Sequence, residues 1–214
     1  MPLRERQLRT DAVRNASRII ASAQRVFASA GAEAAMEDIA ADAGVGVATV
    51  YRRFPTKEAL LRVVLDRRFD EVVGAALARA EHEADARDAM RAALRGEVSF
   101  IAGDPNTMAA AMSSGLMTMD LAYRFFEPVA AIVHRGQRDG VFRDDLVTAD
   151  VPRIVLMLAG TLISFAAGSD GWQRYLDLII DMLTADRSRL SPVSAVRDHQ
   201  PPPVLDLLRE PSEK

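Results

Sequence analysis

The stretch Met36–Pro55, MEDIAADAGVGVATVYRRFP, constrains the fold of this chain more than any other. It is typical of two short helices, Met36–Ala43 and Val47–Phe54, separated by a turn that begins at Gly44. Glycine adopts a positive φ at little cost, and a small residue such as Ala40 lets two helices cross closely. The buried face of the pair is expected to contain Ile39, Ala43, Val45, Val50 and Phe54. The pattern therefore predicts a helix-turn-helix over residues 36–55.

Helical spacing of apolar residues continues on both sides of this stretch. The sequence predicts a first helix over Asp11–Ala30, stopped by Gly31. Its buried face is expected to contain Ala16, Ile20, Ala23, Phe27 and Ala30. Thr56 is a good N-cap for a long fourth helix. The inward residues of that helix are expected to be Leu60, Leu61, Val64 and Leu65.

Helix starts and stops recur through the rest of the chain, and no stretch shows sustained strand alternation. Starts are predicted at Asp85, Asp104, Thr118, Thr148 and Asp170. The helix from Thr118 is expected to reach about Asp139, with Pro128 either inside it or at a break. The helix from Thr148 is expected to reach about Ala167, and the helix from Asp170 to reach about Arg187. The fold class is all-α: a three-helix head (residues 1–55), a helical body entered by the fourth helix (56–190) and a proline-rich tail (191–214).

Composition narrows the possible compartments and chemistries. Of the 214 residues, 49% are hydrophobic and none is cysteine. A chain without cysteine has no disulfide framework, thiolate zinc site or cysteine nucleophile, and suits a reducing cytoplasm. The first ten residues lead into no apolar stretch, and the apolar run Val151–Ala167 is short for a bilayer and interrupted by Pro152 and Arg153. A cytoplasmic protein without a membrane partner is expected.

Charge is distributed unevenly along the chain. Residues 1–62 hold ten Lys/Arg and seven Asp/Glu, which is a net charge of +3. Because the whole chain has a net charge of −3, residues 63–214 carry −6. A basic head on an acidic body is expected when only the head meets phosphates. The basic residues Arg4, Arg6 and Arg9 precede the predicted first helix. They serve either as an arm that reaches DNA or as solubilising charge.

Residues 10–65 resemble the TetR family of one-component transcriptional regulators. The resemblance rests on Phe27 and Gly31 at the end of the first helix, D-I-A-x-x-A-G-V at Asp38–Val45, and P-T-K-E-A-L-L at Pro55–Leu61, with Thr49, Tyr51 and Phe54 between them. It implies a DNA-binding head, a helical effector-binding and dimerisation body, and a double-stranded operator with an inverted repeat. Repression relieved by a small hydrophobic effector is the expected function.

The resemblance also implies roles for residues of the second helix of the motif. Val47, Ala48, Thr49 and Arg52 match positions that approach base edges, whereas Tyr51, Arg53 and Lys57 match positions that bind phosphates. Two positions depart from the family pattern, because Ala35 and Gly46 stand where a hydroxyl residue is usual. We expect phosphate binding there, including at Gly46, to shift towards backbone amides and arginines.

The body is expected to hold the partner surface and the effector. By resemblance, residues 149–187 pair with a second subunit as a homodimer, and apolar stripes around Leu158 and Ile179 fit this. Methionines and aromatic residues line adaptable pockets, although ordinary core explains each one equally well. The candidate pocket residues are Met108, Met112, Met117, Tyr123, Phe126, Met157, Phe165 and Trp172.

Other classes of function are less well supported. The histidines His82, His134 and His199 have no partner at metal-ligand spacing, and the sequence has no nucleophile elbow or phosphate-binding glycine loop. No catalysis, metal or cofactor is therefore expected. An effector-independent DNA-binding protein and a transcriptional activator remain open alternatives.

Overall fold

The computed structural model describes residues 3–166, 168–185 and 190. The described residues form helices joined by turns and loops; they contain no strand, only one isolated bridge between Phe142 and Thr184. This confirms the all-α prediction. The chain divides into two compact units, Met1–Arg68 with Asp104–Leu116, and Phe69–Gly103 with Met117–Lys214. The proline-rich tail predicted for residues 191–214 lies outside the described residues.

The first unit contains α1 (Leu3–Ala30), η1 (Gly31–Glu33), α2 (Met36–Ala43), α3 (Val47–Arg53), most of α4 (Lys57–Phe69), and α7 (Pro105–Ser113). Its core includes Ile19, Ala23, Phe27, Met36, Ile39, Ala40, Ala43, Val50, Phe54, Leu60, Leu61, Val64 and Leu65. The predicted helix-turn-helix is confirmed at both of its helices. The N-cap at Thr56 is also confirmed, because its Oγ1 accepts a hydrogen bond from the Ala59 N–H at 3.1 Å.

The first helix differs from the prediction at its start and on its buried face. It begins at Leu3, so Arg4, Arg6 and Arg9 lie within the helix and do not precede it. Leucine, arginine, glutamate and glutamine are strong helix formers, and no glycine or proline interrupts residues 3–30. On the buried face, Ile19 takes the place predicted for Ile20, which is half-buried, and Ala30 is exposed.

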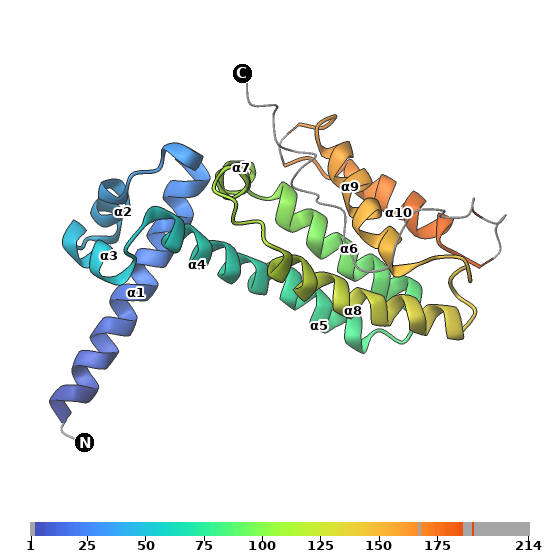
Figure 1. Ribbon diagram of the computed structural model, residues 1–214, viewed down its shortest axis with the longest axis horizontal. Helices are drawn as coiled ribbons and strands as arrows, with labels where there is room; N and C mark the ends of the chain where they lie inside the picture. Colours follow the sequence, from blue (N-terminus) through green and yellow to red (C-terminus); the bar gives the residue numbers. More distant parts are fainter. Residues whose placement is uncertain (1–2, 167, 186–189, 191–214) are drawn as a thin grey trace. The chain divides into compact units, whose positions relative to one another are not determined.

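The second unit contains η2 (Asp70–Gly74, a π-helical turn), α5 (Ala75–His82), α6 (Ala86–Ala102), α8 (Met119–Arg138), η3 (Thr148–Asp150), α9 (Val151–Leu162) and α10 (Trp172–Met182). Within this unit α6 is central and contacts η2, α5, α8, α9 and α10 (Figure 1). Two glycines permit close packing. A Cβ on Gly96 would lie 2.3 Å from that of Ala76, and one on Gly136 would lie 2.2 Å from the Phe142 ring.

Helix boundaries in the second unit agree with the prediction where a cap or proline marks them. The Asp85 carboxylate accepts the Arg87 N–H at 2.7 Å, and α8 continues through Pro128 as one helix. The last two helices are shorter than predicted. Helix α9 ends at Leu162, and α10 begins after Gly171 without a side-chain cap, so Asp170 does not cap it.

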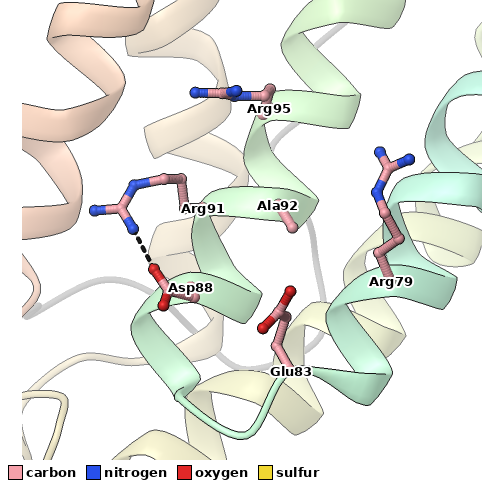
Figure 2. A pocket seen from close by; sticks show the side chains of 6 residues that line it. All are labelled: Arg79, Glu83, Asp88, Arg91, Ala92 and Arg95. Atoms are coloured by element: carbon pink, nitrogen blue, oxygen red, sulfur yellow. Dashed lines mark hydrogen bonds and ion pairs between the residues drawn. The ribbon is translucent and has the colours of Figure 1, made fainter.

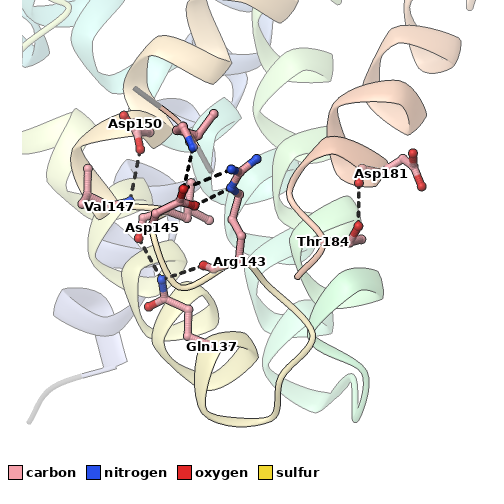
Figure 3. Close-up of polar contacts among 9 residues, drawn as sticks. Gln137, Arg143, Asp145, Val147, Asp150, Asp181 and Thr184 are labelled. Atoms are coloured by element: carbon pink, nitrogen blue, oxygen red, sulfur yellow. Dashed lines mark hydrogen bonds and ion pairs between the residues drawn. The ribbon is translucent and has the colours of Figure 1, made fainter. Parts of the chain in front are cut away.

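A polar cluster lies in the loop after α8 (Figure 3), and the Arg143 N–H connects this loop to the end of α10 by donating to the Leu183 carbonyl at 3.0 Å. The Arg143 guanidinium binds the Asp145 carboxylate at 2.5 and 3.1 Å, and that carboxylate also accepts the Leu190 N–H at 2.7 Å. The Gln137 side-chain amide donates to the carbonyls of Arg143 and Leu146 at 3.0 and 2.8 Å. Among the described helices, none is both long and apolar enough to cross a bilayer.

Candidate DNA-binding interface

The turn between α2 and α3 is built around Gly44. Its φ is +62°, and the following Val45 N–H donates to the Ala40 carbonyl at 3.0 Å. This left-handed glycine ends α2 and sends the chain directly into α3. The Arg18 guanidinium on α1 donates to the carbonyls of Ala43 and Gly44, so the end of α2 is also fixed from outside the motif.

A second polar link holds α2 against α1. The Ser22 hydroxyl, buried in α1, lies 2.6 Å from Asp42 Oδ2 and 2.9 Å from the Ile39 carbonyl oxygen. The Arg25 guanidinium binds the same carboxylate oxygen at 2.5 Å. The hydrogen bonds from Ser22 and Arg25 hold the pKa of Asp42 below its ordinary value. These contacts set the position of α2, and therefore of the helix that follows it.

Helix α3 presents one face to solvent and one to the core. Val50 is fully buried and Phe54 is buried, whereas Val47 and Tyr51 are 39% and 44% exposed. Gly46, Ala48, Arg52 and Arg53 are also exposed, and Thr49 is half-buried. Because residues four apart share a helix face, the predicted contact residues of α3 lie together on its outer side. A helix of this width fits the major groove of B-DNA.

Positive charge lies on and beside this face. Within the part of the chain that the structure describes, the guanidinium groups of Arg52 and Arg53 have no acidic partner. Lys57, the first residue of α4, is half-buried, and its ammonium donates to the Ala32 carbonyl at 2.6 Å. That hydrogen bond fixes the Lys57 side chain at the start of α4.

The first turns of α2 and α3 lack side-chain caps. Neither Ala35 nor Gly46, the two N-cap residues, contributes a side-chain hydrogen bond. Both are the positions where the sequence lacks the usual hydroxyl residue. In the part of the chain that the structure describes, the first N–H groups of each helix therefore donate to no capping side chain, and such groups can bind a phosphate oxygen directly.

Helix α7 belongs to the same compact unit as α1. The Asn106 side-chain amide donates to the Ala28 carbonyl at 2.8 Å, and Asp104 Oδ2 lies 3.6 Å from the Arg68 guanidinium. The Asn106 carbonyl oxygen lies 3.2 Å from the place of a Cβ on Gly31, whose φ is +55°. These contacts could not be predicted from the sequence, because the partners lie far apart along the chain.

The candidate pocket residues are divided between the two units. Met108 is buried and Met112 half-buried on α7 in the first unit. In the second unit Trp172 is buried, Met117, Phe126 and Phe165 are half-buried, and Tyr123 and Met157 are exposed. No candidate residue lines the groove of about 390 Å³ between α5 and α6 (Figure 2). That groove is lined by Arg79, Glu83, Asp88, Arg91, Ala92 and Arg95, with Arg91 bound to Asp88.

The model of the family "Bacterial regulatory proteins, tetR family" matches residues 19–64, which span the helix-turn-helix and its supporting helices. No curated protein sequence matches the chain.

Several solved structures share the fold. A TetR transcription regulatory protein from Mycobacterium vanbaalenii is 29% identical, with a TM-score of 0.59, over 83% of this chain and 99% of that one. A TetR transcriptional regulator from Streptomyces coelicolor is 27% identical, with a TM-score of 0.59, over 80% of this chain and 99% of that one. A regulator from Saccharomonospora viridis, crystallised with choline, is 22% identical, with a TM-score of 0.64, over 80% and 98% of the two chains.

Proposed function

Because this chain belongs to the TetR family of bacterial regulatory proteins, we propose that it is a transcriptional repressor that a small hydrophobic effector releases from its operator. The observation that carries the proposal is the outer face of α3, where exposed apolar, aromatic and basic side chains lie on a helix whose other face is fixed in the core. Two solved structures that share the fold are described as TetR transcriptional regulators.

In the proposed complex α3 lies in the major groove. Val47, Ala48, Thr49 and Arg52 face base edges there, and Arg52 offers the two parallel N–H groups that recognise guanine. Tyr51, Arg53 and Lys57 bind phosphates, joined by the uncapped backbone amides at Gly46. Base contacts choose the sequence, whereas phosphate contacts strengthen binding to every sequence alike.

The proposed assembly is a homodimer through residues 149–187. Its support is an apolar surface on α9 and α10, where Met157, Leu178 and Met182 are about half exposed and Ile163, just after α9, is 92% exposed. Exposed apolar side chains on adjacent helices mark contact surfaces. A symmetric dimer carries two copies of α3 and therefore reads two half-sites of an inverted repeat.

The proposed effector binds the helical body. The shared fold with a regulator crystallised with choline supports a ligand site in this architecture, although that likeness extends to the fold alone. The effector must bind one arrangement of the two heads better than the other, because only such a difference in affinity moves the equilibrium.

Selection of DNA from a random duplex pool by the full-length protein tests the operator proposal. We expect the selected sequences to share an inverted repeat with half-sites one helical turn, or a multiple of it, apart. The Arg52→Ala variant should lose about 1–3 kcal/mol of binding free energy at one base position only, whereas Tyr51→Phe should bind all operator variants more weakly by the same factor. Absence of an enriched sequence, or a uniform loss for Arg52→Ala, would contradict the proposed roles.

A further inference from the structure

Glu97 on α6 carries a buried carboxyl oxygen that the proposed function does not yet use. Its Oε2 atom is inaccessible to solvent and has no hydrogen-bond partner in the described part of the protein. The residues one turn away on the same side of the helix, Ala93, Leu94 and Phe100, are fully buried. An acceptor of hydrogen bonds therefore stands without a donor on the core-facing side of the second unit's central helix.

Such an arrangement opposes folding unless something else compensates for it. Burial alone raises the pKa of Glu97 from 4.5 to about 7, and no charged side chain contributes to the shift. Buried polar groups in folded proteins nearly always have a partner, and an exception is a candidate for a functional site. The missing partner of Glu97 is a hydrogen-bond donor, preferably one that carries positive charge.

We propose that Glu97 is the polar contact of the effector, and that the effector is an apolar molecule with an amine or ammonium head group. The inference rests on the proposed effector control of this chain and specifies the chemistry of the ligand. A protonated amine supplies both the N–H donors and the charge that the Glu97 carboxylate lacks. The apolar surroundings of Glu97 on α6 favour a hydrocarbon for the remainder of the molecule.

The alternative head groups are less suitable for physical reasons. An alcohol donates one hydrogen bond without charge, and hydrogen bonds to ionised groups are about twice as strong as neutral ones. A carboxylate would bring a second negative charge next to Glu97, and like charges in a site of low dielectric repel. An anionic ligand would instead suit Arg135 on α8, whose Nε and Nη2 atoms are buried without a partner in the described residues.

Calorimetric titration of the full-length protein distinguishes these ligands. The probes are n-alkylamines, n-alkan-1-ols and n-alkanoates of four to ten carbons, compared at equal chain length at pH 8. We expect the best amine to bind at least about tenfold more tightly than its alcohol, because a charged hydrogen bond replaces a neutral one. In Glu97→Gln, which keeps the side-chain shape, this preference should fall to about twofold or less, whereas the exposed control Glu81→Gln should behave as the wild type.

Binding of no amine to the wild type, or an amine preference that Glu97→Gln retains, overturns the inference. Tight binding of an alkanoate that is lost in Arg135→Met overturns it in favour of an anionic effector. These outcomes are read without DNA, so they are separate from the proposed function. If the protein selects no operator, the proposal that it is a regulator fails, whatever ligand it binds. If alcohols or alkanoates release the protein from a selected operator, effector control stands but the assignment of an amine ligand fails.

Discussion

Replacing Glu97 with glutamine should change how the stability of the second unit depends on pH. In the folded protein burial raises the pKa of Glu97 to about 7, against 4.5 in an exposed chain. Between these two values the folded state binds more protons than the unfolded state at this site. The free energy of unfolding therefore falls as the pH rises from about 4.5 to about 7, and this contribution is constant above that range.

The size of the effect follows from the difference between the two pKa values. One pKa unit corresponds to about 1.4 kcal/mol, so the wild type should lose up to about 3 kcal/mol across this interval from Glu97 alone. Glutamine has no proton to lose, and Glu97→Gln should lack this loss. The variant should gain little stability relative to the wild type at pH 5, and about 3 kcal/mol at pH 8.

Tryptophan fluorescence gives a signal specific to this unit. Trp172 is the one tryptophan of the chain, and it is buried at the start of α10, which contacts α6. Urea unfolding followed by this fluorescence at pH 5, 6, 7 and 8 gives the difference between the two proteins at each pH. The exposed Glu81→Gln variant controls for a change of net charge. A difference between wild type and Glu97→Gln that stays constant from pH 5 to 8 would show that the Glu97 carboxyl is not buried.

Three further predictions concern the turn, the loop cluster and the partner surface. Gly44→Ala should destabilise the head by about 1–2 kcal/mol and weaken operator binding, because its φ is +62°. The matched Gly46→Ala, with φ −69° and no atom within 4 Å of the added Cβ, should lower the thermal midpoint much less, by no more than the loss of a preferred N-cap residue. Asp145→Asn should lower stability at pH 7 but not below pH 2, because Arg143 lowers the Asp145 pKa to about 2 and its contribution is lost as the pH falls through that value. Leu178→Glu should give folded monomers in sedimentation, whereas Ile179→Glu should unfold the second unit, since their exposures are 50% and 8%.

The head could be predicted from the sequence because its signals are local. A glycine that needs a positive φ, a threonine that caps the next helix and a proline after the recognition helix each act within a few residues. Their effect on the backbone hardly depends on the rest of the fold. The limits of α2 and α3 were therefore correct to within a residue. The start of α1 was predicted at Asp11 but lies at Leu3, because residues 3–10 favour a helix and contain no glycine or proline that marks a boundary.

Contacts between distant residues had no such signal. Ser22 is buried on α1 and Asp42 is exposed on α2, and only their position in space shows that they bind each other. The Asn106 amide reaches a carbonyl 78 positions away. The chain after α10, which ends at Met182, is likewise held from outside, because the Ala185 N–H donates to the Val141 carbonyl. Apolar spacing predicts which face of a helix is buried, but it does not predict which residues elsewhere in the chain contact that face.

Helix α10 shows why apolar residues on one helix can have two different roles. Leu176 and Ile180 are fully buried within the protomer, while Leu178 and Met182 on another side of the helix are about half exposed. Because consecutive helical residues are 100° apart, one packing surface cannot cover both pairs. Leu176 and Ile180 are buried by contacts within the protomer. Leu178 and Met182 can be buried only by contact with another surface. The stripe around Ile179 that suggested a dimer is therefore mostly intramolecular core, and the proposed partner surface is the neighbouring face at Leu178 and Met182.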